Sequence, residues 1–210
     1  MVNKNRCVVI GGGVISDYSK TKLNINEQDF IICADKGYLH SKEMNLQPDL
    51  IIGDFDSSPY PENNNCKVIK LNPEKDETDL FLAVSEGYKL GYKDFLLLGC
   101  LGGRFDHTFA NLTLLAYWTD KGAKLVLKDE QNEILMLNPG IYSFSKTSKY
   151  ASFFAYSSEV NGLKLNGFKY PLNGYNLSNS CGLCVSNEII SDKCTVSFAS
   201  GRLLTIFSTD

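Results

Sequence analysis

The segment DFIICADKGYLHSKEMNLQPDLIIGD, residues 29–54, decides the fold class of this chain. Two short apolar runs, Asp29–Ala34 and Asp49–Asp54, flank a helical stretch that follows Asp35 and Gly37. Runs of this length, apolar at almost every position, are typical of strands that are buried on both faces of a parallel sheet. The segment therefore predicts two parallel strands joined by a helix.

The same rhythm extends over the first 130 residues. Further strand-like runs occupy Arg6–Ile10, Cys66–Leu71, Asp94–Cys100 and Ala123–Lys128. Glu77–Leu90 and Phe109–Lys121 place apolar side chains near one face of a helix, and Gly122 ends the second of these helices. We therefore predict an α/β domain with a mostly parallel, doubly wound sheet over residues 1–130.

After Glu130 the pattern changes to short alternating runs. Turn pairs such as Pro139-Gly140 and Ser200-Gly201 break these runs at close intervals. Period-two alternation with turns at this spacing predicts antiparallel sheets that pack as a sandwich or barrel. We therefore expect an all-β domain over residues 131–210.

The bulk composition limits the classes of partner. The 210 residues carry a net charge of -3, so we expect no extended basic surface for a nucleic acid or an anionic membrane. No apolar run approaches the roughly 20 residues that cross a bilayer, and the first residues lack the pattern of a signal peptide. We expect a cytoplasmic protein with small-molecule partners.

The cysteines give no sign of a disulfide framework, because there are seven of them and most lie in apolar stretches. Cys181 and Cys184 form a CxxC pair, but no second pair and no histidine pair completes a zinc site. We interpret both as ordinary thiols.

The first acidic motif, IIGDFDSS at residues 51–58, places Asp54 and Asp56 two residues apart after a buried strand. At strand spacing both carboxylates would face the same way, at the sheet edge where open α/β sheets bind ligands. A hard cation such as Mg²⁺ would offset their repulsion. An acidic turn whose side chains cap backbone amides accounts for the same residues.

The second acidic motif, PEKDETD, covers residues 73–79 at the start of a predicted helix. Asp76 as N-cap and Asp79 near the third helical position resemble a capping box. Asp79 can also reach a metal bound at the first pair of aspartates. Lys75 and Thr78 add a cation and a hydroxyl donor for phosphate.

The third motif, GCLGGRFDHTFANL at residues 99–112, joins a predicted strand to a predicted helix. Gly102 and Gly103 let backbone amides approach an anion, and the guanidinium of Arg104 can bind two phosphate oxygens. Asp106 either caps the helix or acts in the chemistry. For His107 a structural role is favoured over that of a general base.

Two further loops follow strands at the same edge of the sheet. The backbone of the glycine triplet within residues 8–17 can lie against a nucleotide, although no helix follows directly as in a dinucleotide fingerprint. Asp35 stands where a carboxylate meets a ribose or a metal, and a helix cap is equally consistent with its position.

Taken together, the motifs GDFDS, PEKDETD and GGRFDH, followed by GFKYPL and VSNE, resemble the thiamine pyrophosphokinase family over nearly the whole chain. The resemblance implies a transferase that moves a pyrophosphoryl group from ATP to the hydroxyl of thiamine with the help of Mg²⁺. The products would be thiamine diphosphate and AMP. It also implies a homodimer, with thiamine between the α/β part of one subunit and the β-rich part of the other.

The resemblance also implies roles for individual residues. The catalytic set is Asp54, Asp56, Asp76, Asp79, Arg104 and Asp106, of which Asp54, Asp56 and Asp79 would hold the metal. The ATP-binding set is Asp35, Lys75, Thr78, Gly102, Gly103, Arg104 and His107. The thiamine set is Tyr170, Ser186 and Asn187. Without the resemblance, Tyr170 would be interpreted as a core or edge-strand aromatic.

Two alternatives stay open at this point. The enzyme can act on another small alcohol, because the α/β part alone does not define the acceptor. The chain can also be a non-catalytic thiamine or nucleotide sensor, although three intact carboxylate positions argue against this. Lys36 and the cysteine-rich loop around Cys181 depart from the pattern expected for the family.

Overall fold

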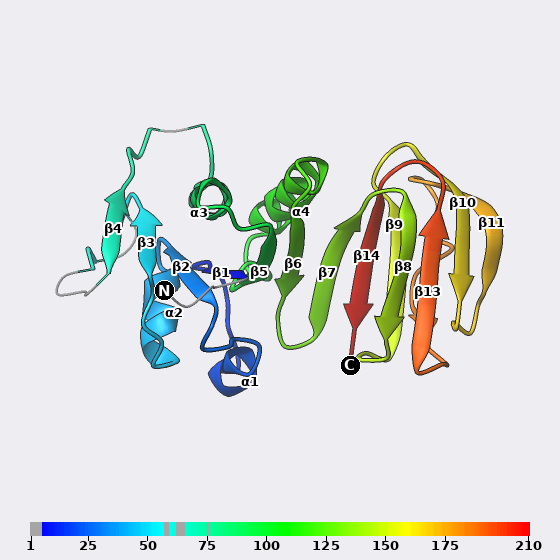
Figure 1. The fold of residues 1–210 in the computed structure, drawn as a ribbon, viewed down its shortest axis with the longest axis horizontal. Coiled ribbons are helices and arrows are strands. Elements are labelled where there is room, and N and C mark those ends of the chain that lie inside the picture. The colour runs from blue at the N-terminus through cyan, green and yellow to red at the C-terminus, as the bar shows by residue number, and fades with distance from the viewer. Residues whose placement is uncertain (1–5, 57–58, 62–65, 75) are drawn as a thin grey trace. The chain divides into compact units, whose positions relative to one another are not determined.

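The structure, a computed structural model, describes residues 6–56, 59–61, 66–74 and 76–210. Contacts within the chain cluster into two compact units, Met1–Glu130 and Gln131–Asp210. The helices gather in the first unit and strands make up the second (Figure 1). No described helix has both the length and the apolar character that a bilayer-spanning segment requires.

Parallel strands form the sheet of the first unit. They are β1 (Cys7–Ile10), β2 (Phe30–Ala34), β3 (Leu50–Gly53), β4 (Lys67–Lys70), β5 (Asp94–Leu98) and β6 (Lys124–Lys128). They pair in the order β4-β3-β2-β1-β5-β6, and each of these pairs is parallel. The strand order reverses between β1 and β5, and ligands of open α/β sheets bind beside such a switch point at the carboxyl ends of the strands.

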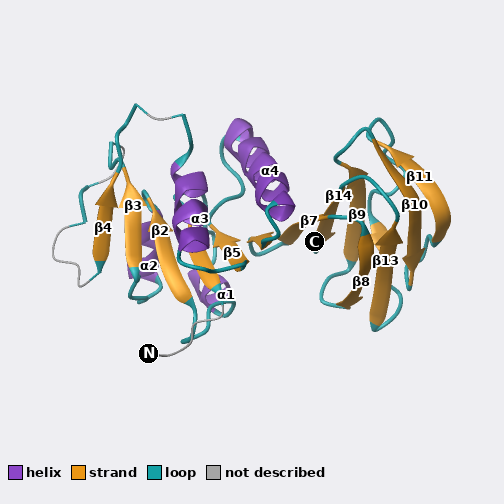
Figure 2. Cartoon of the chain, turned by 45° about the horizontal axis from the view of Figure 1, so that its top comes forward, coloured by secondary structure: helices purple, strands orange, loops and turns teal. Residues whose placement is uncertain are grey.

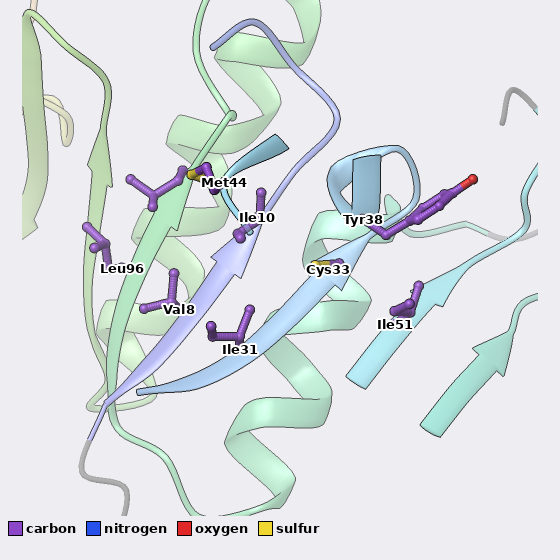
Figure 3. Packing of buried hydrophobic residues seen from close by; sticks show 9 residues of the cluster. Val8, Ile10, Ile31, Cys33, Tyr38, Met44, Ile51 and Leu96 are labelled. Atoms are coloured by element: carbon purple, nitrogen blue, oxygen red, sulfur yellow. The ribbon is translucent and has the colours of Figure 1, made fainter. Parts of the chain in front are cut away.

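The helices of the first unit are α1 (Tyr18–Lys22), α2 (Gly37–Glu43), α3 (Asp79–Lys89) and α4 (Phe105–Asp120). Helix α2 packs against one face of the sheet. The buried cluster on this face, seen in Figure 3, consists of Val8, Ile10, Ile31, Cys33, Tyr38, Met44, Ile51, Leu96 and Leu98. Full burial of each aliphatic side chain contributes about 1.5–3 kcal/mol. Alternate strand residues point to opposite faces, so Cys7 and Val9 face the other side.

The helix α3 covers that other side. A Cβ on Gly87 would lie 2.7 Å from the Phe95 ring and 3.1 Å from the Cys7 Sγ, so the helix backbone lies close to these side chains. Figure 2 shows α2 and α3 on opposite sides of the strands. This arrangement confirms the predicted doubly wound α/β class.

Two helices begin at positions that differ from the prediction. Helix α3 begins at Asp79 because Thr78 is its N-cap, with Oγ1 accepting a hydrogen bond from the Phe81 N–H at 3.2 Å. The prediction that Asp76 caps this helix is therefore wrong. Helix α4 begins at Phe105, four residues before the predicted start, directly after a glycine turn.

The second unit consists of two antiparallel sheets. Its strands are β7 (Asn132–Leu137), β8 (Gly140–Ser145), β9 (Tyr150–Ala155), β10 (Glu159–Asn166), β11 (Leu172–Ser178), β12 (Asn187–Glu188), β13 (Lys193–Phe198) and β14 (Leu203–Ser208). One sheet has the order β12-β9-β14-β7, and the other β11-β10-β13-β8. The rings of Phe144 on β8 and Phe207 on β14 lie 4.9 Å apart, so the sheets pack face to face. The predicted all-β class is confirmed.

Candidate functional site

A pocket of about 460 Å³ opens at the carboxyl edge of the parallel sheet. The loop after β1 contributes Gly11 and Gly12, and the end of β2 with the loop after it contributes Ala34, Asp35 and Lys36. The approach to α3 and its first residues contribute Pro73, Glu77, Thr78, Asp79 and Leu80, and the first turn of α4 contributes His107. The pocket lies where the strand order predicts a ligand site.

The glycine triplet lets β1 end close against the loop after β5. The N–H groups of Gly11 and Gly13 donate to the carbonyls of Leu98 and Gly99, each at 2.8 Å. A Cβ on Gly13 would lie only 2.6 Å from the Gly99 oxygen, and one on Gly12 would lie 2.8 Å from the Lys36 Cβ. The glycines are therefore needed for close backbone packing at the mouth of the pocket.

The loop after β2 is held equally tightly. Asp35 has a left-handed backbone with φ of 44°, and its N–H donates to the Ile52 carbonyl at 2.8 Å. A Cβ on Gly37 would lie 1.8 Å from the Ile10 oxygen, so only glycine lets α2 begin against β1. These contacts fix Asp35 on the wall of the pocket.

The N-termini of α3 and α4 reach the pocket. Thr78 and Asp79 are the N-cap and first residue of α3, and the Oδ1 oxygen of Asp79 is buried. His107 lies in the first turn of α4. Backbone N–H groups at helix starts favour an anion such as a phosphate, so the pocket is suited to a phosphorylated ligand.

Asp54 and Asp56 lie at the same sheet edge but outside the pocket lining. The strand β3 ends at Gly53, and Phe55 has a left-handed φ of 58°. Asp54 Oδ1 accepts a hydrogen bond from the Asp56 N–H at 3.2 Å. The two aspartates therefore do not lie on an extended strand, and the prediction that they do is wrong. Instead, the side chain of Asp54 closes a turn.

Arg104 and Asp106 form an exposed ion pair beside the pocket-lining His107. Arg104 Nε donates to Asp106 Oδ1 at 3.1 Å, and a second bond joins Nη2 to Oδ2. The hydrogen bonds from Arg104 hold the pKa of Asp106 below its ordinary value. Asp106 lies inside the first turn of α4 and Arg104 occupies the N-cap position, so Asp106 is not the N-cap.

The two predicted phosphate glycines differ in role from the triplet after β1. Gly102 and Gly103 have left-handed φ values of 76° and 68°. Among the described residues, and apart from its chain neighbours, no atom lies within 4 Å of a Cβ built on Gly103, whereas one on Gly102 would lie 3.8 Å from the Val14 Cβ. Their function is to turn the chain into α4. Asp76 is exposed before α3, and Lys75 lies outside the described residues.

The acidic residues of the pocket suit a hard cation that is shared with a ligand. Among the residues that the structure describes, no three His, Cys, Asp or Glu side chains are grouped as a metal site. The pocket wall nevertheless carries the carboxylates of Asp35, Glu77 and Asp79. Mg²⁺ is usually held by one or two carboxylates together with phosphate oxygens, and this donor set fits that mode.

Tyr170, the aromatic residue of the predicted thiamine set, lies in the second unit on the loop after β10. The Tyr170 side chain is 61% exposed, so it is not a core aromatic. Asn187 is 3% exposed, and its amide bonds to the backbone of Tyr170. Ser186 has a left-handed φ of 55°, and its N–H donates to the Ser152 Oγ at 2.9 Å. Tyr170 and Asn187 are thus joined by hydrogen bonds, and Ser186 directly precedes Asn187 in the chain.

The sequence patterns did not predict several residues of the pocket and of the region around Ser186. Pro73 and Glu77 belong to the second acidic motif and Leu80 follows it, but none of the three was predicted to line the site, and only a correct helix start would have placed them there. Ser152 supports Ser186 from 34 residues away, and no sequence pattern signals such a contact.

Two family models match the chain. The first, described as the catalytic domain of thiamin pyrophosphokinase, matches residues 21–127. The second, described as the vitamin B1 binding domain of thiamin pyrophosphokinase, matches residues 141–203. Apart from Gly11 and Gly12, the pocket-lining residues lie in the segment that matches the first model, and Tyr170, Ser186 and Asn187 lie in the segment that matches the second.

Individual proteins match over most of the chain. A thiamine pyrophosphokinase of Bacillus subtilis (strain 168) is 37% identical over 194 residues, which cover 88% of this chain and 90% of the relative. The crystal structure of thiamine pyrophosphokinase from Bacillus subtilis superposes with a TM-score of 0.89 at 32% identity, covering 98% of this chain and all of that one. The thiamin pyrophosphokinase structure from Geobacillus thermodenitrificans gives 0.88 at 29% identity and covers 98% of each chain.

Proposed function

The chain belongs to the thiamine pyrophosphokinase family, and on this basis we propose that it transfers a pyrophosphoryl group from ATP to the hydroxyl of thiamine. The products are thiamine diphosphate and AMP. The pocket at the carboxyl edge of the parallel sheet is the observation that carries this proposal, because the starts of α3 and α4 and a glycine loop meet there. Apart from Gly11 and Gly12, its lining residues lie in the segment that matches the catalytic model.

The donor ATP occupies this pocket in our proposal. The glycine loop lies along the nucleotide, and Asp35 accepts hydrogen bonds from the ribose or helps to hold the metal. Thr78 Oγ1 already accepts from Phe81, and its O–H hydrogen can donate to a phosphate oxygen. Gly102, Gly103 and His107 belong to the turn and helix start that face the phosphates.

Mg²⁺ is part of the same proposal. Asp79 on the pocket wall would hold the ion together with phosphate oxygens, and Asp54 and Asp56 would contribute from the loop after β3. When bound, the ion supplies positive charge that neutralises the phosphate oxygens during transfer. Asp76, which is exposed, precedes Asp79 by three residues in the chain.

Positioning and charge compensation account for most of the catalysis that we propose. The Arg104 guanidinium moves from Asp106 to the phosphate oxygens when ATP binds, and Lys75 adds a second cation. While paired, Asp106 is a weak base because Arg104 lowers its pKa. Loss of that pairing raises its proton affinity, which suits a role as acceptor of the thiamine hydroxyl proton.

The acceptor binds beside Tyr170, Ser186 and Asn187 in this proposal. Thiamine is a cation with flat rings, and an exposed aromatic ring attracts such a cation. We also propose a homodimer with thiamine at the subunit interface, and a cytoplasmic location where ATP is available.

Release of AMP from ATP tests the proposed reaction. We expect AMP only when both Mg²⁺ and thiamine are present, with thiamine diphosphate formed in equal amount. Mass spectrometry of the products from a panel of alcohols identifies a different acceptor if there is one. Binding of thiamine or ATP by calorimetry without AMP release would show a sensor and would contradict the proposal.

A further inference from the structure

We propose that His40 is a positioning residue for the donor nucleotide. It would act by holding the glycine loop Gly11–Gly13, of which Gly11 and Gly12 line the pocket, in one shape. His40 is not among the pocket-lining residues, so its effect passes through the loop. This inference rests on the proposed use of the pocket for ATP.

Both ring nitrogens of His40 form hydrogen bonds. Nε2 lies 2.8 Å from the Gly13 carbonyl oxygen, and Nδ1 lies 2.9 Å from the Tyr18 hydroxyl. A carbonyl oxygen only accepts, so Nε2 carries the hydrogen, and in the neutral ring Nδ1 then accepts from the Tyr18 O–H. The Gly13 carbonyl thereby selects the tautomer, and the hydroxyl of Tyr18 holds the ring in the orientation that binds Gly13.

The glycine loop is fixed from two sides as a result. The N–H groups of Gly11 and Gly13 donate to the carbonyls of Leu98 and Gly99. From α2, His40 binds the Gly13 carbonyl. Glycine loses more conformational freedom on ordering than any other residue, so a loop of three glycines needs such attachments to keep one shape.

Helix α2 brings His40 to this place. The helix begins at Gly37, which touches the Ile10 carbonyl so closely that no Cβ fits. The start of α2 is thus held against the end of β1, and His40 one turn later lies beside the loop that continues from β1. The geometry therefore couples the end of β1, the helix and the loop.

Three variants test the role of His40. His40→Ala removes both hydrogen bonds, whereas His40→Gln keeps an N–H donor at the distance of Nε2 from the backbone. Tyr18→Phe removes only the hydroxyl that orients the ring. Tyr88→Phe is the matched control, because it removes a hydroxyl that donates to the Lys121 carbonyl at 2.8 Å, and neither residue lines the pocket.

Calorimetric titration with ATP and Mg²⁺ gives the decisive measurement. We expect His40→Ala to raise the Kd for ATP about fivefold, the equivalent of one hydrogen bond. His40→Gln restores most of the affinity, Tyr18→Phe has a smaller effect than His40→Ala, and Tyr88→Phe has none. Hydrogen exchange should show faster exchange of the Gly11–Gly13 amides in His40→Ala.

Two results would overturn the inference. One is wild-type affinity for ATP in a folded His40→Ala variant, and the other is a His40→Gln variant that binds ATP no better than His40→Ala. If His40→Ala does not fold, the comparison of Tyr18→Phe with Tyr88→Phe decides in the same way. A wild-type protein that binds ATP but releases no AMP with thiamine contradicts the proposed reaction alone, and one that binds no ATP contradicts both.

Discussion

The side-chain amide of Asn187 forms two hydrogen bonds with the backbone of Tyr170. The Tyr170 N–H donates to Oδ1 at 3.0 Å, and Nδ2 donates to the Tyr170 carbonyl at 2.8 Å. An amide offers an acceptor and a donor side by side, as a neighbouring strand does. The exposed Tyr170 ring therefore stands on a backbone that is held by a buried side chain.

We expect Asn187→Asp to lower the stability and to raise the KM for thiamine. A carboxylate still accepts from the Tyr170 N–H, but it has no hydrogen for the Tyr170 carbonyl. A buried polar group left without its partner costs about 1–3 kcal/mol. Thermal unfolding and steady-state kinetics measure the two effects. Wild-type values for both would show that Asn187 does not position Tyr170.

Tyr170→Ala should give a different combination of effects. Because the ring is largely exposed, its removal should leave the free energy of unfolding almost unchanged. We expect a raised KM for thiamine with a smaller decrease in kcat, since the ring would contact the acceptor and not the reacting phosphate. Tyr170→Phe keeps the ring and serves as the control. An unchanged KM in Tyr170→Ala places the acceptor pocket elsewhere.

Asp54→Asn separates the two interpretations of the first acidic motif. Asparagine keeps the side-chain oxygen that accepts from the Asp56 N–H, so the turn should stay intact. It removes the negative charge that a metal needs. We expect turnover with ATP and Mg²⁺ to be abolished in Asp54→Asn, and likewise in Asp79→Ala, while both proteins stay folded by circular dichroism.

Full activity of Asp54→Asn would assign Asp54 to the turn alone. Full activity of Asp79→Ala would remove Asp79 from the metal site.

Glu130, the last residue of the first unit, gives the chain a pH-dependent contact. Its Oε1 accepts hydrogen bonds from the N–H groups of Ser16 and Asp17 at 2.9 and 2.8 Å. Burial alone would raise its pKa, but these hydrogen bonds favour the charged form and leave the pKa below the ordinary value of 4.5. The carboxylate therefore stabilises the fold when it is ionised.

The stability of wild type relative to Glu130→Gln should follow from this pKa. The advantage of wild type should be constant above the ordinary pKa of 4.5 and should be lost as the pH falls through the lower pKa of the folded state. Urea unfolding over a pH series measures it. Glu86→Gln, which breaks an exposed pair with Lys89, is the control. An advantage that persists unchanged at about pH 3 would contradict the assignment.

The sequence pattern was sufficient for the fold class because continuous apolar runs and alternating runs have different burial requirements. Helix starts were harder to predict. Asp76 and Thr78 are both good N-caps, and only the backbone geometry of Thr78 selects it. The predicted strand spacing of Asp54 and Asp56 was wrong for another reason. A left-handed backbone at a residue such as Phe55 is rare, and no local pattern in the sequence indicates it.

The site could be predicted only in part. The pocket contains Asp35, Thr78, Asp79 and His107, which stand next to strand ends or helix starts that the sequence indicates. The contacts of Asn187 were not predictable, because they join a side chain to a backbone 17 residues away. Such pairs depend on how the sheets fold over each other, which a local pattern does not contain.

The close contact of Gly37 with the Ile10 carbonyl has a consequence for evolution. A Cβ at position 37 would overlap that oxygen, so any other residue there must move α2 away from β1. We therefore expect position 37 to accept no residue other than glycine without a shift of the backbone. Among descendants of this enzyme, differences in the nucleotide preference that we propose for the pocket should arise at lining positions that are not glycine, such as Lys36, Pro73 and His107.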